Sequence, residues 1–399
     1  MNLLGDRLRS PRLGVLDLNP IQYHTPLYQR LAARANVRLD VLYLSDHGLR
    51  PALDPGFGVP VAWDIDMLSG YQHEFLAGSG PARARRLARW LRWHDAVVTY
   101  GHSNPWMLAA AAGCRACGVP YLLRGDSGAR GQSGGIRGAA RYAIARAVVA
   151  GSAGGLAIGH GNEQFYERYG ARRIFFAPHS VDNERFAAPP AVSRPALLAR
   201  WGLDDRRPVI MFCGKLIQSK RPLDLAAAAA RLGSRATVLF VGDGALAGEV
   251  RSMLTPGGGA VTGFVNQAEL PSYYHAADIL VLPSQTEPWG LVVNEAMNAG
   301  ALPIVSDRVG CGPDLVAGLG EVYPGGDVDA LTAALRRGLA RIGSPGLADS
   351  VRQRVAGYGL DATAAGFEQA AAEVAADAAA GRRRRRRRRS DHGTPPNPR

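Results

Sequence analysis

Residues 278–307 read DILVLPSQTEPWGLVVNEAMNAGALPIVSD, and this stretch decides the fold. The apolar runs at its two ends, DILVLPS and LPIVSD, have the composition of buried strands. Between them a helix is expected over Leu291–Ala299, with Gly300 as its C-terminal stop. Pro288 and Gly290 keep the preceding residues out of that helix. A strand, a loop, a helix and a second strand form the repeating unit of a parallel α/β sheet.

The same alternation of strand and helix runs through most of the chain. It predicts an α/β protein with two tandem Rossmann-like domains, because short strands that alternate with helices form doubly wound parallel sheets. Such sheets bind ligands at the carboxyl ends of their strands, so the expected site is a cleft between the domains. The other expected strands are RLGVLDL (12–18), VRLDVLYLS (37–45), AVVTY (96–100), PYLLR (120–124), GGLAIG (154–159), RIFFAP (173–178), VIMFCG (209–214), TVLFVG (237–242) and AVTGFV (260–265).

The domain boundaries follow from changes in this pattern. The N-terminal domain is expected over residues 1–185 and the C-terminal domain over 209–358, joined by a proline-containing linker at 186–208. Residues 359–380 are alanine-rich and predict a long helix, which could pack back on the N-terminal domain. Residues 381–399 are expected to form a disordered, arginine-rich tail.

Composition and charge limit the classes of protein. The 399 residues are 47% apolar and 20% charged, as in soluble globular proteins, and neither a membrane span nor a secretory signal is evident. The formal charge is +13, of which the segment after Gly381 contributes +8 through the run Arg382–Arg389 and leaves +5 on the body. We expect that run to be solvated, with contact to an anionic membrane leaflet as the alternative, and we expect no specific nucleic-acid partner.

Cysteine usage bears on location and on redox chemistry. Four cysteines suggest a reducing compartment rather than a disulfide scaffold. The missing secretory signal and the family resemblance described below imply a cytoplasmic location, with a peripheral position at the inner membrane face as an alternative. Cys114 and Cys117 form a C-x-x-C pair, which raises a redox or metal site as a possibility. The pair ends an alanine-rich helix and has no second pair at zinc-ligand spacing, so we interpret both as small helix residues.

A basic loop follows the first strand of the C-terminal domain. Gly214 lets the backbone approach a ligand closely, and Lys215 and Lys220 flank the loop. Two ammonium groups at a strand's carboxyl end could neutralise a diphosphate, although a solvated basic loop explains the pattern equally well. The loop lacks the spacing of a P-loop.

Two carboxylates interrupt the decisive stretch. Glu287 falls in the loop before the helix, and Glu295 falls inside the helix on a largely apolar face. A buried carboxylate needs hydrogen-bond donors, which could be hydroxyl groups of a bound sugar or ribose, or an arginine or lysine in a structural ion pair. The N–H groups of Trp289, Gly290 and Leu291 at the helix start form an anion site. Together with the basic loop, these groups suit a nucleotide-sugar.

The C-terminal half resembles a known family. The segments FCGKLIQSKRPLDLAAAAARL, LFVGDG and VTGFVNQAELPSYYHAADILVLPSQTEPWGLVVNEAMNAGALPIVSDRVG are similar in order and spacing to retaining GT-B glycosyltransferases of the GT4 family. The E-x7-E motif, Glu287 to Glu295, is the most specific element. The resemblance implies a retaining transfer from a nucleotide-sugar, UDP- or GDP-linked, to a hydroxyl of a saccharide or lipid-linked acceptor. It also implies a place in polysaccharide or glycoconjugate biosynthesis.

The resemblance also implies roles for individual residues. Glu287 would bind hydroxyl groups of the donor sugar and Glu295 the ribose, while Lys215 and Lys220 would hold the diphosphate. The backbone near Phe264 and Val265 would contact the base. Gly214, Trp289, Gly290 and Leu291 complete the expected donor site.

The N-terminal half departs from the family pattern. Many members carry a histidine after the strand that is PYLLR here, where this chain has Asp126 or Ser127. We take Asp126 and His102 as candidate catalytic residues beside Glu287, Lys215 and Lys220. The acceptor-side candidates, which all lie near expected strand ends, are His24, Arg124, His160 and Asn162.

Two further features of the sequence bear on metal binding and on other activities. Asp64-Ile-Asp66 and Asp327-Val-Asp329 are formal D-x-D pairs, but neither has the context of a metal site, so we expect no metal and no cofactor besides the nucleotide-sugar co-substrate. Two alternatives stay open at this point. One is another GT-B activity, a phosphorylase or an epimerase, and the other is a protein that binds nucleic acid or membrane through the arginine run.

Overall fold

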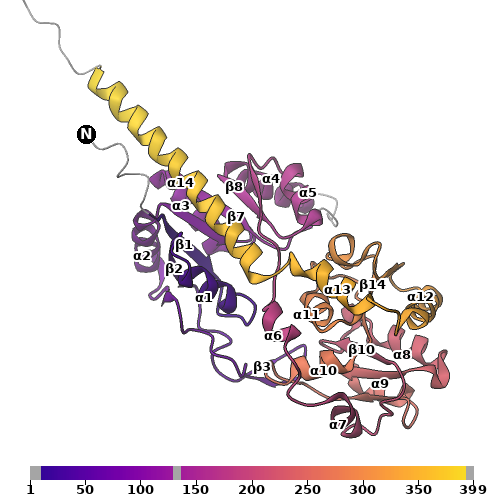
Figure 1. Ribbon diagram of the computed structural model, residues 1–399. Coiled ribbons are helices and arrows are strands. Elements are labelled where there is room, and N and C mark those ends of the chain that lie inside the picture. Colours follow the sequence, from indigo (N-terminus) through magenta and orange to yellow (C-terminus); the bar gives the residue numbers. More distant parts are fainter. Residues whose placement is uncertain (1–9, 129–135, 392–399) are drawn as a thin grey trace, which may run out of the picture.

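The computed structural model describes residues 10–128 and 136–391, which form two domains, each built on one parallel sheet (Figure 1). The N-terminal sheet has the order β5-β2-β1-β6-β7-β8-β9, and all of its pairings are parallel. Its strands are β1 (Arg12–Asp17), β2 (Arg38–Tyr43), β5 (Gln72–Phe75), β6 (Ala96–Tyr100), β7 (Tyr121–Arg124), β8 (Gly154–Ala157) and β9 (Ile174–Phe176). The helices of this domain are α1 (Thr25–Ala33), α2 (Gly80–Trp93), α3 (Pro105–Cys117), α4 (Ile136–Gly151) and α5 (His160–Arg168).

The C-terminal sheet has the order β12-β11-β10-β13-β14-β15 and is also parallel. Its strands are β10 (Val209–Cys213), β11 (Thr237–Val241), β12 (Gly259–Val261), β13 (Ile279–Leu282), β14 (Leu302–Ser306) and β15 (Glu321–Tyr323). Its helices are α8 (Pro222–Ala230), α9 (Ala247–Met253), α10 (Leu270–Ala276), α11 (Leu291–Ala299), α12 (Val328–Arg341) and α13 (Leu347–Ala356). The predicted class, two Rossmann-like domains with parallel sheets, is confirmed.

Continuous apolar strands place the cores on both faces of each sheet. All residues of β10, β11 and β14 are buried, as expected for parallel strands covered by helices on both sides. The region expected as a linker, residues 186–208, contains packed helical structure. Besides α6 (Asn183–Ala187) it contains α7 (Arg194–Ala199), whose Leu197 and Leu198 are buried in the C-terminal core. Because these apolar side chains are buried, the segment is part of the C-terminal core, which its prolines do not indicate.

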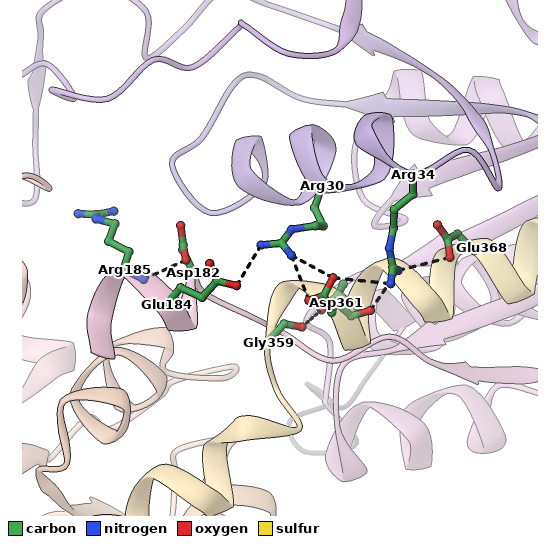
Figure 2. Close-up of polar contacts among 9 residues, drawn as sticks. Arg30, Arg34, Asp182, Glu184, Arg185, Gly359, Asp361 and Glu368 are labelled. Carbon is green, nitrogen blue, oxygen red and sulfur yellow. Dashed lines mark hydrogen bonds and ion pairs between the residues drawn. The ribbon is translucent and has the colours of Figure 1, made fainter. Parts of the chain in front are cut away.

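The last helix, α14 (Leu360–Asp391), returns from the C-terminal domain and lies along the N-terminal sheet (Figure 1). Its Phe367, Ala370 and Ala371 are buried beside residues of α1 and β1. Charges add to this contact, as Figure 2 shows. Arg30 of α1 lies 3.0 Å from Asp361, and Arg34 lies 3.4 Å from Glu368. The chain therefore crosses between the domains twice.

The arginine run differs from its prediction. Helix α14 continues through Asp391, so Arg382–Arg389 are helical where a disordered tail is expected. Arginine has a high helix propensity, and a helix already started by packed alanines can extend through it. In Figure 1 this end of α14 projects beyond the N-terminal domain, away from the C-terminal domain. Residues 392–399 lie outside the described part.

No helix in the described ranges is both long enough and apolar enough to span a bilayer.

Candidate active site

A cavity of about 420 Å³ lies between the domains, within the usual size range of small-molecule sites. Its C-terminal wall comes from the loops after β10 and β11 and from the start of α11. Its N-terminal wall comes from loops after β1, β7 and β9, together with a short hairpin. Both sheets thus present their carboxyl edges to one space. The residues that line it include Tyr23, Asp54, Phe57, Trp63, Asp126, His179, Gly214, Lys215, Lys220, Phe264, Val265, Glu287, Trp289, Gly290, Leu291 and Glu295.

Glycines bring the backbone close together at the base of the C-terminal wall. Gly214 has φ of 140° and Gly242 has φ of 142°, values that favour glycine. A Cβ atom on Gly242 would overlap the Gly214 carbonyl oxygen. These two strand ends can therefore approach a ligand with backbone rather than side chains.

Lys215 and Lys220 are the only lysines of the chain, whose other 45 cationic side chains are arginines. Both line the cavity, and each is paired with a carboxylate. Lys215 Nζ lies 2.8 and 2.9 Å from the two carboxylate oxygens of Asp54, a residue of the N-terminal domain. Lys220 pairs with Glu287. The basic loop is therefore engaged at the site and is not a freely solvated loop.

Asp54 is held as a carboxylate by its surroundings. Burial alone would raise its pKa, but hydrogen bonds from Lys215 and from the N–H groups of Gly56 and Phe57 outweigh burial and lower the pKa. Asp54 lies in β3 (Ala52–Asp54), which pairs antiparallel with β4 (Val59–Val61). This hairpin reaches from the N-terminal domain to the lysine loop.

The loop before α11 adopts the expected irregular path. Gly290 has φ of 100°, and a Cβ atom there would lie 2.8 Å from Leu282 Cδ2. The backbone of Glu287 is fixed by hydrogen bonds with Arg308 and Gly310. In the described ranges no hydrogen bond uses the N–H groups of Trp289, Gly290 or Leu291. These N–H groups and the positive end of the helix dipole lie at the cavity wall, where an anion would be stabilised if one were bound.

Glu295 is 1% exposed and lines the cavity from inside α11. Its Oε2 accepts a hydrogen bond from the Tyr274 hydroxyl, and its Oε1 has no partner in the described part of the chain. Burial raises the pKa of Glu295 to about 7, although the Tyr274 hydrogen bond and the charge of Arg185 act in the opposite direction. The ion pair considered from the sequence is absent among the described residues, since the donor is a tyrosine.

The N-terminal candidates separate into two groups. Asp126 lines the cavity, as its place after β7 suggests. His102 is not among the lining residues, and its ring stacks on Phe165 with centroids 5.7 Å apart. Burial lowers the pKa of His102. Arg124 is fully buried and donates to the carbonyl oxygens of Ala177 and Pro178 at 2.6 and 3.2 Å.

The other acceptor-side candidates also lie outside the lining described for the cavity. His24 Nδ1 is 2.7 Å from Asp17 Oδ2, and His24 is not among the residues described as lining the cavity. His160 is exposed on α5 and contacts Gln164 at 3.0 Å. Asn162 is buried, and it accepts from Ile158 N and donates to the Ser127 carbonyl oxygen. Being near a strand end does not bring a side chain to the cleft when the backbone nearby needs a partner.

Sequence reasoning missed six lining residues of the N-terminal domain, of which Gln22 lies in the loop after β1. His179 follows β9, and burial holds its pKa well below the ordinary value, which favours the neutral imidazole. The strand-end rule, applied after RIFFAP, could have found it. Tyr23 stands one residue before a candidate that was named. The other three, Asp54, Phe57 and Trp63, lie in or after the hairpin, for which no sequence signal was recognised.

The D-x-D pairs have structural roles. Asp64 accepts from the Ala268 N–H, and Asp66 accepts from the N–H groups of the turn that follows it. Asp327 caps α12, and Asp329 pairs with Arg231. The described residues contain no group of three or more His, Cys, Asp or Glu side chains placed to hold a metal ion. Cys114 is buried at the end of α3, as expected for a packing residue.

Two Rossmann-like domains that face each other across a ligand-sized cavity define the GT-B fold, and solved structures support this class. HepE of Anabaena in complex with UDP superimposes with a TM-score of 0.70 at 14% identity, over 90% of this chain and 98% of that one. Sucrose-phosphate synthase of Thermosynechococcus elongatus gives a TM-score of 0.65 at 20% identity, over 90% and 98% of the two chains.

The family match comes from the C-terminal half of the chain. Residues 207–341 match the family described as "Glycosyl transferases group 1". The match covers less than half of the chain, and it confirms the resemblance to glycosyltransferases found in the sequence of this region.

Curated relatives match part of the chain. The chain is 30% identical over 138 residues to the sulfoquinovosyl transferase of Arabidopsis thaliana, which is 33% of this chain and 27% of that protein. It is 32% identical over 174 residues to the GDP-mannose-dependent alpha-(1-6)-phosphatidylinositol monomannoside mannosyltransferase of Mycolicibacterium smegmatis, 40% of this chain and 45% of that protein. The matches thus span less than half of either relative's length.

Proposed function

We propose that the protein is a retaining, metal-independent glycosyltransferase of the GT4 type, which moves a sugar from a nucleotide donor to an acceptor hydroxyl. One observation carries the proposal: Lys215, Lys220, Glu287, Glu295 and the start of α11 all line one cavity, so cations, carboxylates and a helix N-terminus face the same space. The family match over 207–341 supports the same chemistry.

The proposed mechanism begins with an exchange of partners at the lysines. A diphosphate that enters the cavity would displace Glu287 from Lys220 and Asp54 from Lys215, because phosphate offers more negative charge and more acceptor oxygens. Glu287 would then be available to accept hydrogen bonds from hydroxyls of the donor sugar. The free Oε1 of Glu295 would accept one from the ribose.

Charge builds on the diphosphate as the glycosidic bond breaks. The two ammonium groups and the N–H groups of Gly290 and Leu291 would stabilise that charge, and such donors contribute most in the transition state. The acceptor hydroxyl would attack from the face that the diphosphate leaves. Asp126 is the candidate for orienting it, since it lines the cavity from the opposite domain. His102 would act only if it moved away from Phe165.

The names of similar proteins narrow the choice of substrates to test. HepE was solved with UDP and with UDP-glucose, and the mycobacterial relative is named as GDP-mannose-dependent and acts on a phosphatidylinositol monomannoside. We propose a UDP- or GDP-sugar as donor, a saccharide or lipid-linked acceptor, and action in the cytoplasm in polysaccharide or glycoconjugate synthesis.

A donor screen tests this proposal. Full-length protein is incubated with UDP-, GDP-, ADP- and dTDP-sugars, and the melting temperature and the release of nucleoside diphosphate are measured, with and without EDTA. We expect one nucleotide class to raise the melting temperature, because it binds only the folded state, and EDTA to leave turnover unchanged. Stabilisation by none of them would contradict the proposal. Release driven by inorganic phosphate would instead identify a phosphorylase, and interconversion of the sugar without transfer an epimerase.

We also propose that the arginine end of α14 contacts an anionic membrane surface. Arg382–Arg384 are exposed, and Arg382 lines a surface hollow with Arg92 and the exposed Trp93. Basic residues near an anionic leaflet contribute about 1 kcal/mol each. In a sedimentation assay, phosphatidylglycerol vesicles should bind the full chain and should not bind a chain that ends at Gly381. Equal sedimentation of both chains would exclude this role for the arginines.

A further inference from the structure

Residues 52–64, here called the bridging segment, belong to the N-terminal domain and yet contact the C-terminal domain along their length. The segment comprises β3, β4 and the residues up to Asp64. At its start Asp54 pairs with Lys215. At its end Asn266 Nδ2 donates to the Ala62 carbonyl oxygen at 2.6 Å, and Ala268 N donates to Asp64 at 3.2 Å.

Between these anchors the bridging segment presents two aromatic rings to the cavity. Phe57 meets Phe264 edge to face with centroids 5.0 Å apart, and Trp63 lies 6.1 Å from the same ring. All three rings line the cavity and all are only partly buried. Half-buried aromatic rings that surround an open space can gain contact area and stacking when a flat ligand enters.

Phe57 also touches the phosphate end of the site. The Lys215 Nζ lies 5.1 Å from the centre of the Phe57 ring. A nucleotide whose diphosphate rests on Lys215 and whose base reaches Phe264 would therefore pass along Phe57. The close approach depends on Gly56, because a Cβ atom there would lie 2.5 Å from Lys215 Cδ.

We infer that Phe57 and Trp63 form, with Phe264, the wall that receives the nucleobase, so that a segment of the N-terminal domain determines how tightly the donor nucleotide is held. This inference rests on the proposed function, since it assumes that the ligand is a nucleoside diphosphate-sugar. The ligand class is a nucleoside diphosphate, whose base the rings contact by stacking. The bridging segment then does more than join the domains.

Two probes separate this role from a structural one. Calorimetric titration of the full chain with a nucleoside diphosphate, UDP or GDP, measures base and phosphate contacts together. Titration with inorganic pyrophosphate measures the phosphate contacts alone. We expect Phe57→Ala and Trp63→Ala each to weaken nucleoside diphosphate binding by about 10-fold or more, the usual loss when one stacking ring is removed, and to leave pyrophosphate binding within about twofold. Trp93→Ala, at a tryptophan that is 62% exposed and outside the cavity, is the matched control.

The outcomes are distinguishable. If neither nucleoside diphosphate binds the wild-type chain, the proposed function itself is wrong. If one binds and the two variants bind it as tightly as the wild type, the function stands and the base wall is elsewhere. Equal weakening of both probes would mean that the rings only hold the bridging segment in place, which also overturns the inference. Phe57→Leu, which keeps an apolar side chain without the ring, should lose nucleotide affinity if stacking matters, and should retain it if the role is packing.

Discussion

The two walls of the cavity are built in different ways. The C-terminal wall uses one β–α–β unit and the loops after β10, β11 and β12, in which glycine conformations and a helix start position the backbone. The N-terminal wall is assembled from loops that are far apart in sequence, and several polar side chains near it, such as Arg124 and Asn162, are occupied with buried backbone. The difference teaches that a polar residue at a strand end acts on a ligand only when the local backbone does not need it. Variants of the two walls should therefore affect different measurements.

The largest effect is expected at the C-terminal wall, for Lys220→Ala. Turnover should fall about 100-fold or more, because a donor that stabilises the developing charge is lost, while the melting temperature changes little. Steady-state kinetics with the donor from the screen measure this. Arg231→Ala, which removes an exposed cation of the same domain outside the cavity, is the control. Turnover close to wild type in the Lys220 variant would remove that lysine from the mechanism.

Glu295, also of the C-terminal wall, should affect stability in a way that depends on pH. The raised pKa of about 7 means that the folded state holds a proton more tightly than the unfolded state, whose ordinary value is 4.5. Wild-type stability relative to Glu295→Gln should therefore fall as pH rises from about 4.5 to about 7 and stay constant above that. The difference of about 2.5 pKa units corresponds to about 3 kcal/mol.

Urea unfolding of both proteins at pH 5 and pH 8 measures this change. Glu287→Gln is the matched control variant, since the Glu287 carboxylate is paired with a lysine. A constant difference between wild type and Glu295→Gln across this range would mean that Glu295 is already ionised in the folded protein at pH 5.

At the N-terminal wall we expect the reverse pattern, for Arg124→Met. The carbonyl oxygens of Ala177 and Pro178 lose charged donors, so stability should fall by about 2 kcal/mol, while the turnover of the folded protein stays within about threefold. Denaturant midpoints and active-site-normalised kinetics report the two quantities. Arg85→Met, at an exposed position of α2, is the control. A large loss of turnover with unchanged stability would indicate that Arg124 acts on the acceptor, as the sequence analysis suggested.

The smallest effect concerns the contact that ties α14 to the N-terminal domain. Arg30→Ala removes the ion pairs with Asp361 and Glu184, which are largely exposed (Figure 2). Exposed pairs contribute about 0–1 kcal/mol, so the melting temperature should hardly move, and less still in high salt. Phe367→Ala, which opens the buried part of the same contact, should cost about 3 kcal/mol or more. Comparable losses for the two variants would show that charge, not burial, holds the helix.

The fold and the C-terminal wall could be predicted because their signals are local. Pro288, Gly290 and Gly300 fix the start and end of α11, and the spacing of Glu287 and Glu295 follows from that one unit. The contact of Asp54 with Lys215 joins residues 161 positions apart, and no periodicity or spacing encodes it. The tyrosine donor to Glu295 likewise comes from another helix, α10, so the sequence left an arginine or lysine as the alternative.

The scarcity of lysine has a practical consequence. Apart from the α-amino group of the chain, the only primary amines of this protein are the two that face the cavity. A reagent that acylates amines would therefore modify the proposed donor site and leave the many arginines unmodified. Mass spectrometry of the intact chain would count the modified sites directly, and protection by a bound nucleotide would appear as a loss of up to two acyl groups. Acylation of the two lysines would therefore report whether the cavity is occupied, and no engineered probe is required.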